Sequence, residues 1–215
     1  MPTEHLDNLG YLHDGLIAVH CRCMTPVEES ILARRSVTVC FTPVATARSG
    51  NSPRIGDLAR AGCPIVLGTD EFSGDMVEVM RLSVLLERVR RGDSQRPTPP
   101  EAWVWASRNG YKSIGIDDAG SIAPGNRADL IMINMRKTHL VPAIRIASAF
   151  VHHGQASDVE AVMVDGRWVM KDGRILTLDE DALLEKAGRL GRIAWRRSLA
   201  SDPGVHAPAD LDIHR

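Results

Sequence analysis

The chain has 215 residues, a formal net charge of −1 and 44% hydrophobic residues, which suffices for one large domain or two small ones with an ordinary core. The near-neutral charge argues against nucleic acid or an anionic membrane as a partner, because either would leave a basic excess. Short basic runs at 34–35, 88–91 and 196–197 lie in helical patterns, so we expect them on solvated helix faces. No apolar stretch approaches the ~18 residues that span a bilayer, and the N-terminus lacks a secretory pattern, so we expect a cytoplasmic protein.

Four cysteines lie in apolar contexts: Cys21, Cys23, Cys40 and Cys63. A disulfide framework is not expected without an export signal. No pair of these cysteines has the two-residue gap that is typical of a zinc knuckle. We therefore expect buried, reduced thiols.

Three short apolar runs in the first 70 residues indicate β-strands, at 16–20 (LIAVH), 36–41 (SVTVCF) and 63–70 (CPIVLGTD). Helical patterns separate them: one from Thr25, and a short one over 55–61 that Gly62 closes. The segment after Phe41 is rich in small and polar residues and is expected to be a loop. Continuous apolar strands that alternate with helices predict a parallel sheet covered on both faces.

A long amphipathic helix is predicted from Asp75 to Arg91, ended by Gly92. Its apolar face is expected to comprise Met76, Val79, Met80, Leu82, Leu86 and Val89. Three helix starts carry the capping box, in which a threonine hydroxyl and a glutamate satisfy backbone N–H groups at the first turn. These boxes run from Thr25 to Glu28, from Thr98 to Glu101 and from Thr177 to Glu180.

After Gly110 the pattern changes to short strands and tight turns. A Pro-Gly-Asn turn precedes a strand in 120–134, and two Asp-Gly turns in 159–178 predict antiparallel hairpins. A final helix is expected from Thr177 to about Ser198. We therefore divide the chain into an α/β unit (1–118), a small antiparallel β unit (119–176), a C-terminal helix (177–200) and a mobile tail (201–215).

Two polar residues end predicted parallel strands, His20 after LIAV and Asp70 after IVLGT. Functional groups of parallel sheets gather at the carboxyl ends of the strands. A carboxylate there can ligate a metal, and an imidazole can orient the bound water or relay a proton. Two simpler interpretations stay open: Asp70 caps its turn, or His20 is a half-buried histidine bonded to a backbone carbonyl. The other seven histidines show no ligand spacing.

Read from end to end, residues 3 to 195 resemble the C-terminal half of the amidohydrolase superfamily, in the branch of triazine chlorohydrolases, guanine deaminases and methylthioadenosine/adenosylhomocysteine deaminases. The matching stretches are AVHC (18–21), IGDLARAGCPIVLGTD (55–70), DMVEVMRLSVLLE (75–87), PPEAWVWASRNGYKSIGI (99–116), GSIAPGNRADLIMIN (120–134) and VMVDGRWVMKDGRILT (162–177). The resemblance implies an α/β fold: the last three strands and helices of a (β/α)8, TIM-like barrel, with a small antiparallel β unit of the composite β-sandwich domain.

The resemblance also implies roles for the two strand-tip residues. Asp70 would ligate the metal and take a proton from the attacking water, and His20 would hydrogen-bond the hydroxide or the substrate. The implied cofactor is one divalent metal ion, zinc first and iron as the alternative, not held by this chain alone because Asp70 is its only implied ligand. The implied substrate is a small heterocyclic amine or halide, attacked hydrolytically at an sp² carbon.

Some positions depart from the family pattern, and they leave a second hypothesis open. The stretch Phe41 to Thr46 replaces a polar family motif, Cys23 stands where many relatives have histidine, and the loop after Asp70 is short. The implied strands one to five would precede this chain. The chain is thus either part of a hydrolase of non-peptide carbon–nitrogen bonds or a catalytically silent remnant that serves as a structural or binding subunit. In both cases we expect a homo-oligomer or a partner that supplies the missing strands.

Overall fold

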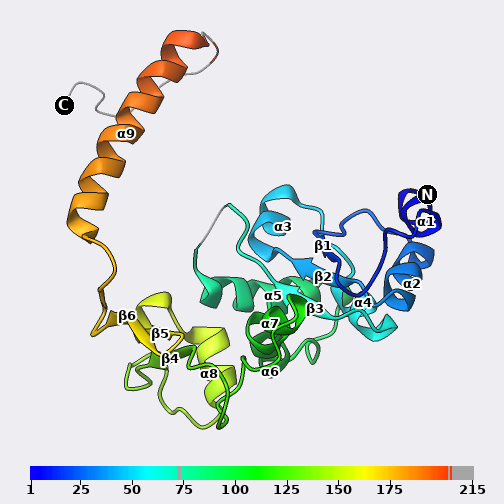
Figure 1. The fold of residues 1–215 in the computed structure, drawn as a ribbon, viewed down its shortest axis with the longest axis horizontal. Helices are drawn as coiled ribbons and strands as arrows, with labels where there is room; N and C mark the ends of the chain where they lie inside the picture. Colours follow the sequence, from blue (N-terminus) through cyan, green and yellow to red (C-terminus); the bar gives the residue numbers. More distant parts are fainter. Residues whose placement is uncertain (72–73, 203, 205–215) are drawn as a thin grey trace.

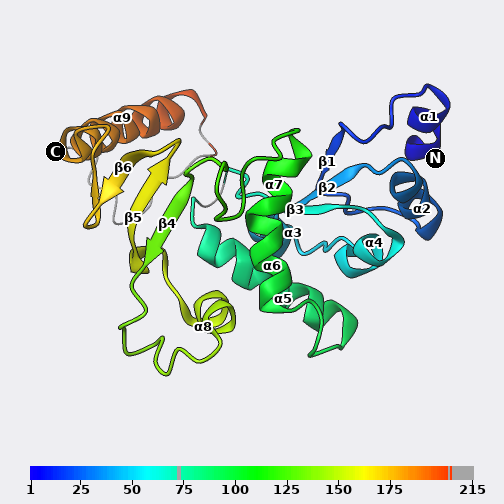
Figure 2. The same cartoon turned by 60° about the horizontal axis from the view of Figure 1, so that its bottom comes forward.

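The computed structural model describes residues 1–71, 74–202 and 204. Two sheets organise this part of the chain (Figures 1 and 2). The predicted mobility of 201–215 falls mostly on residues 203 and 205–215, which lie outside the described residues.

The first sheet is parallel and has the order β1-β2-β3. Its strands are β1 (Ile17–Val19), β2 (Thr38–Phe41) and β3 (Ile65–Leu67), and all three fall within the predicted apolar runs. Ile17 pairs with Thr38, and Val39 pairs with Ile65. Since the strands run the same way, their carboxyl ends meet at one edge of the sheet.

Helices connect and cover these strands. They are α1 (Pro2–Asn8), α2 (Pro26–Arg34), α3 (Pro43–Ser49), α4 (Ile55–Ala61), α5 (Met76–Arg91), α6 (Pro99–Ala106) and α7 (Arg108–Ser113). The capping boxes at Thr25 and Thr98 are confirmed, because each threonine side chain accepts from the backbone N–H three residues on. Val39, Phe41, Ile55, Leu58 and Ile65 are fully buried between sheet and helices and form the core of this unit.

The prediction of a loop after Phe41 is wrong, because α3 occupies Pro43–Ser49. Pro43 stands in the first turn, where its missing N–H costs little. Ala45 and Thr46 are buried in this helix and α3 packs on α5, so the small side chains that suggested a loop permit close helix packing instead.

The long helix α5 forms as predicted, and its buried face matches the predicted apolar face only in part, at Val79 and Met80. Val77, Val79, Met80, Ser83, Val84 and Glu87 are its buried residues, whereas Val89 is 82% exposed. A carboxylate occupies this buried stripe because Arg90 Nη2 lies 2.6 Å from Glu87 Oε1 and the backbone N–H of Gly56 donates to the same oxygen at 2.9 Å. The prediction that residues 88–91 form a solvated basic face is therefore wrong for Arg90.

The second sheet is antiparallel, with the order β4-β5-β6-β7. Its strands are β4 (Leu130–Ile133), β5 (Val159–Val164), β6 (Arg167–Lys171) and β7 (Arg174–Ile175). Both Asp-Gly hairpins are confirmed: Asp165 and Gly166 have φ of 49° and 75°, and Asp172 and Gly173 have φ of 50° and 72°. Positive φ at both central residues is what such a turn requires.

Helix α8 (Ile146–His153) and the 3-10 turn η1 (Ala156–Asp158) are additional to the predicted elements. Phe150 and Val151 of α8 are fully buried against Val77, Val84 and Ala102 of α5 and α6. The ring centroids of Trp103 and Phe150 lie 5.6 Å apart. This cluster joins the antiparallel sheet to the helices that cover the parallel one (Figure 2).

The last helix, α9 (Glu180–Ser201), begins three residues later than predicted, because Asp179 rather than Thr177 caps it by accepting from the N–H of Ala182 at 3.0 Å. It extends away from both sheets (Figure 1) and has no buried residue. Among the described residues, no helix has the length and apolar character that crossing a membrane requires.

Candidate functional site

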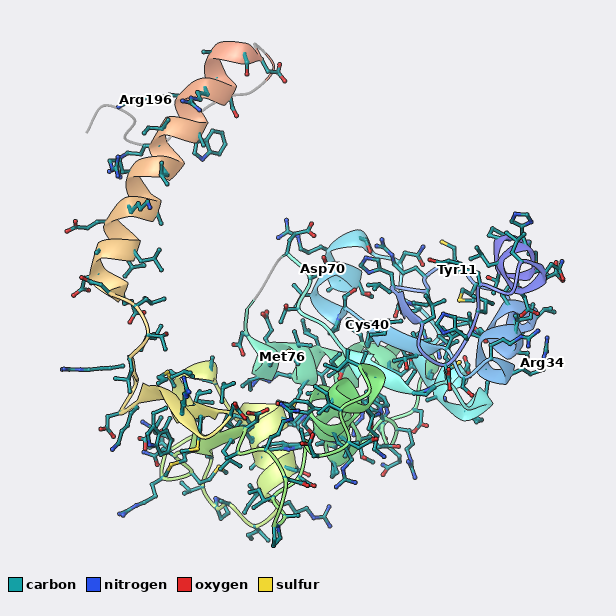
Figure 3. All side chains as sticks on the ribbon, in the orientation of Figure 1. Tyr11, Arg34, Cys40, Asp70, Met76 and Arg196 are labelled. Carbon is teal, nitrogen blue, oxygen red and sulfur yellow. The ribbon has the colours of Figure 1, made fainter. Side chains whose placement is uncertain are left out.

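His20 and Asp70 lie together at the carboxyl edge of the parallel sheet. His20 directly follows β1 and Asp70 follows β3, on either side of the central strand, and His20 Nε2 lies 3.7 Å from Asp70 Oδ2. Figure 3 shows Asp70 beyond the end of the strands and Cys40 within β2. The sequence-based expectation that parallel strands bring these two side chains to one edge agrees with this geometry.

His20 and Asp70 both have a left-handed backbone conformation that residues other than glycine seldom adopt. The φ angle is 70° at His20, 49° at Cys21 and 56° at Asp70. Left-handed backbone at non-glycine residues costs free energy and persists where the surrounding structure enforces it, often at functional sites. The turns after β1 and β3 thus direct an imidazole and a carboxylate toward each other at some energetic cost.

Thr42 adds a third strand tip to the site. His20 Nδ1 and Thr42 Oγ1 lie 2.7 Å apart, and Thr42 is buried directly after β2. This contact holds the imidazole by one nitrogen while the other faces Asp70. Sequence reasoning missed Thr42, although it satisfies the same criterion as the other two residues: a polar residue that ends a buried parallel strand.

Gly68 allows β2 and β3 to approach closely beneath the site. A Cβ atom at this position would lie 2.9 Å from Cys40 Sγ and 3.4 Å from Thr42 Cγ2. A distance of 2.9 Å between Cβ and Cys40 Sγ is well inside van der Waals contact. Any side chain at position 68 would therefore displace Cys40 or the strand. Glycine is therefore required for the packing that supports Thr42.

Asp70 is held in its charged form. Hydrogen bonding with Glu71, including the Glu71 backbone N–H at 3.0 Å, keeps the pKa of Asp70 below its usual range, and His20 and Arg22 act in the same direction. An ionised carboxylate at neutral pH can accept a proton or ligate a cation.

A cavity of about 340 Å³ opens over this pair. Its lining residues are His20, Arg22, Ala45, Arg48, Ser49, Asp70 and Glu71. Both Arg22 and Arg48 thus stand beside the two candidate residues, and sequence reasoning did not single out either arginine. The cavity has room for a small molecule but is open to solvent.

All four cysteines are free thiols, and burial raises the pKa of three of them, Cys21, Cys40 and Cys63. Cys63 is buried, Cys21 and Cys40 are half-buried, and Cys23 is exposed, so the prediction of burial is wrong for Cys23. Burial raises the pKa of Cys21 to about 12 and that of Cys63 to about 11. Both therefore remain protonated at neutral pH.

The side chains present do not make a complete metal site. Within the described part of the chain, no group of three or more His, Cys, Asp or Glu side chains is placed to hold a metal ion. His20 and Asp70 supply two polar groups, whereas a zinc centre needs at least three protein ligands.

Comparison with known proteins defines the class. The profile of the amidohydrolase family matches residues 1–169, and this chain belongs to that family. The chain is 34% identical over 192 residues to a 5'-deoxyadenosine deaminase of Methanothermobacter thermautotrophicus, covering 86% of this chain and 44% of that protein. It is 32% identical over the same length to a 5-methylthioadenosine/S-adenosylhomocysteine deaminase of Pelotomaculum thermopropionicum, with the same coverage.

Solved structures share the fold. An adenosine deaminase from Xanthomonas campestris with bound zinc superposes with a TM-score of 0.85 at 24% identity, covering 94% of this chain and 46% of that chain. A mutant atrazine chlorohydrolase from Arthrobacter aurescens, complexed with zinc and atraton, gives 0.80 at 20% identity, covering 88% and 44%. The chain therefore spans less than half the length of these relatives.

Proposed function

We propose that this chain is the part of a metal-dependent amidohydrolase that carries the strand-tip residues His20 and Asp70, and that the complete site hydrolyses a carbon–nitrogen or carbon–halogen bond of a small heterocycle. The observation that supports it most strongly is the 3.7 Å approach of His20 Nε2 to Asp70 Oδ2 from neighbouring strand tips with left-handed backbone. Deaminases among the relatives favour an amine-bearing, adenosine-like substrate.

In this proposal Asp70 is a catalytic base and His20 orients the reactants. The low pKa of Asp70 keeps its carboxylate ready to take a proton from water. His20, fixed by Thr42, presents Nε2 to the oxygen of that water or to the substrate. Hydrogen bonds of this kind place the water against the ring carbon and stabilise the charge that develops there.

Asp70 would also be one ligand of a divalent metal, with zinc as the first choice and iron as the alternative. Such an ion lowers the pKa of its bound water to about 7. Because the described side chains do not complete a ligand set, the remaining ligands must come from outside them. We propose that they lie on barrel strands supplied by a preceding segment or by a partner chain, and that β1 to β3 are the last three strands of the resulting (β/α)8 barrel.

The test is reconstitution. This chain is produced together with the segment of the Pelotomaculum deaminase that precedes the matched region, and bound zinc and ammonia release from S-adenosylhomocysteine and 5'-deoxyadenosine are measured. Asp70→Asn should abolish detectable turnover and lower the bound zinc, and His20→Asn should reduce kcat about 100-fold or more while zinc stays bound. Asp14→Asn changes an exposed carboxylate and should leave both readouts intact.

A second candidate function is a catalytically silent subunit. It is favoured by the absence of a three-ligand group within the described chain. Parallel strands with open edges would then pair with further copies or with another protein. Co-purification of the chain with a partner, without zinc and without turnover after reconstitution, would support this alternative and refute the enzyme. An upstream reading frame that encodes a strand ending in His-x-His would favour the enzyme.

A further inference from the structure

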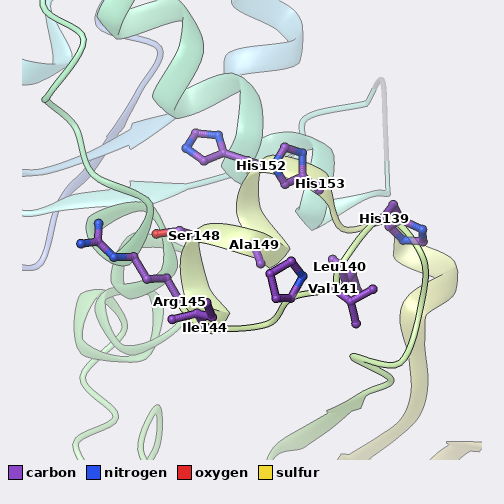
Figure 4. A pocket seen from close by; sticks show the side chains of 10 residues that line it. His139, Leu140, Val141, Ile144, Arg145, Ser148, Ala149, His152 and His153 are labelled. Carbon is purple, nitrogen blue, oxygen red and sulfur yellow. The ribbon is translucent and has the colours of Figure 1, made fainter.

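A separate cavity of about 690 Å³ lies beside α8, away from the strand-tip site. It lies between one face of α8 and the loop that precedes it (Figure 4). From α8 and its N-terminal boundary come Arg145, Ser148, Ala149, His152 and His153, and from the loop come His139, Leu140, Val141, Pro142 and Ile144. We call this cavity the α8 groove.

Arg145 and His152 stand at opposite ends of α8. Arg145, Ser148 and His152 are spaced three and four residues apart, which places them along one face of the helix. At 1.5 Å of rise per residue, Arg145 and His152 are separated by roughly 10 Å along the axis. Arg145 is also the N-cap residue, and its guanidinium, which has only N–H donors, makes no capping bond.

The histidine end of the groove is embedded in further positive charge. Arg81 of α5 binds the backbone carbonyls of Val151, His152 and Gly154 and so fixes a guanidinium at the C-terminus of α8. Burial and the positive charges of Arg88, His153 and Arg81 lower the pKa of His152. His152 is therefore a neutral imidazole at neutral pH, and the positive charge at this end of α8 comes from Arg81 and Arg88.

The loop side contributes a fixed imidazole and an apolar wall. His139 Nε2 lies 2.8 Å from Asp158 Oδ2, and the same oxygen accepts the N–H of Gln155 at 2.8 Å. Asp158 is therefore a buried, hydrogen-bonded carboxylate that orients the His139 ring. Leu140 is buried at the base of this loop, whereas Val141 and Ile144 are 58% and 84% exposed.

From this arrangement we infer that the α8 groove binds an elongated organic anion, with one carboxylate at Arg145, a second acidic group at the histidine end and an apolar body against the loop. A guanidinium recognises a carboxylate through paired hydrogen bonds, and the approximate 10 Å span suits a dicarboxylate with an aliphatic chain between its ends. This site is independent of the hydrolase chemistry proposed for His20 and Asp70.

The test is a titration of the isolated chain with suberate, an aliphatic dicarboxylate, followed by the NMR signals of the histidine rings. Signals of His139, His152 and His153 should shift together and saturate, while that of His13 stays unchanged. Octanoate lacks the second carboxylate and should bind about tenfold more weakly. Equal affinity for both compounds would overturn the two-ended site, and absence of saturable shifts would overturn the site altogether.

Two variants assign the binding to named residues. Arg145→Ala should weaken suberate binding about tenfold or more, whereas Arg34→Ala, an exposed arginine on α2 at the far end of the molecule (Figure 3), should leave it unchanged. Ser148→Asp favours the first turn of α8 by adding a negative charge there, yet it places that charge in the groove. It should therefore preserve the helix and reduce binding to a similar extent. Full affinity in this variant would refute the proposal even if Arg145→Ala fails to fold.

Discussion

Glu87 shows how one residue can determine the packing of a long helix. Only 1% of its surface is exposed, yet its carboxylate is satisfied by Arg90 and by the backbone N–H of Gly56. Arg90 in turn contacts Asp57 at 3.1 Å, so the bond network ties α5 to α4. A buried charge of this kind contributes through its partners, because removal of one member deprives the others of a buried hydrogen bond.

Glu87→Ala should lower the free energy of unfolding by about 3 kcal/mol, because Arg90 and the Gly56 N–H lose their buried partner. Urea denaturation measures the change. Arg60→Ala is the matched control: its side chain is 60% exposed and pairs with Asp57, so the expected change is about 0.5 kcal/mol or less. Similar losses in the two variants would contradict the role of burial.

Asp158 should make the protein sensitive to acid. Burial acts to raise its pKa, but hydrogen bonds from His139 and from the Gln155 N–H outweigh this effect and lower it. Since the folded pKa is below the unfolded value of about 3.9, the stabilisation is complete above that pH and is lost as pH falls through the folded pKa.

Asp158→Asn should therefore reduce stability at pH 7 and flatten its decline below about pH 4. The measurement is the urea midpoint at a series of pH values. Asp117→Asn removes an exposed carboxylate and should follow the unmodified chain. If Asp158→Asn loses stability in acid as steeply as the unmodified chain, this carboxylate is not the group responsible.

At the scale of residues, the positions of strand-tip side chains could be predicted from the sequence where a topological rule applied. His20 and Asp70 are expected near each other because parallel strands end at one edge, and the approach of their side chains agrees with that rule. Their left-handed φ angles and the support from Thr42 depend on turns whose geometry the residue types do not specify. The burial of Glu87 was missed because a glutamate in an amphipathic pattern indicates solvent, and its contact with the backbone N–H of Gly56, which is distant in sequence, cannot be read from that pattern.

At the scale of elements, the ends of β2 and β3 depend on one glycine. Gly68→Ala should destabilise the protein by about 1–3 kcal/mol, because the new methyl group collides with Cys40 Sγ. It should also shift the NMR signal of His20, since Thr42 lies beside Gly68 and contacts that ring.

Combining Gly68→Ala with Cys40→Ala should restore part of the lost stability, because the smaller side chain makes room, and a double-mutant cycle measures this coupling. Gly110→Ala is the control: no atom lies within 4 Å of the added Cβ, so the change should be neutral or stabilising. Additive losses in the cycle would show that the collision with Cys40 is not the cause.

The ends of helices and strands were predictable where a nearby side chain hydrogen-bonds to the backbone or where the turn residues favour positive φ. The threonine caps of α2 and α6 and the Asp-Gly turns of the hairpins are such signals. The start of α9 was misplaced because Asp179 competes with Thr177 as a cap. Helix α3 could not be found from its small residues, since its burial against α5 arises from tertiary packing.

At the scale of the whole molecule, α9 contributes no buried surface to either sheet. Its exposed apolar side chains are Leu183, Leu184, Leu190, Ile193 and Trp195. A chain that ends at Leu178 should therefore have the same free energy of unfolding as the full chain, within about 1 kcal/mol, when both are measured by urea denaturation. It should also self-associate less in sedimentation experiments, because an exposed apolar face promotes association.

Phe150→Ala is the positive control for the urea measurement, because it removes packing that the structure shows to be buried. It removes a fully buried ring between α8 and α6 and should cost about 3–5 kcal/mol. A large destabilisation on removal of α9 would show that this helix packs on the remainder of the chain in solution.

The α/β class and the presence of both a parallel and an antiparallel sheet were predictable from the sequence, because strand composition and turn chemistry are local. The packing that joins the two sheets was not predictable from the sequence. It depends on α8, whose short apolar pattern gave no distinct signal, and on the contact between Trp103 and Phe150, which are far apart in the chain.

In a variant whose other three tryptophans are replaced by phenylalanine, that contact makes Trp103 an optical reporter. Its indole ring lies where the helices beneath one sheet meet the helix that precedes the other, so loosening of this junction would alter its polarity. Water that enters between the rings of Trp103 and Phe150 would shift the Trp103 emission to longer wavelength, even while the hydrogen bonds of both sheets remain intact. The emission of Trp103 would thus show whether the two sheets separate before they unfold or unfold together.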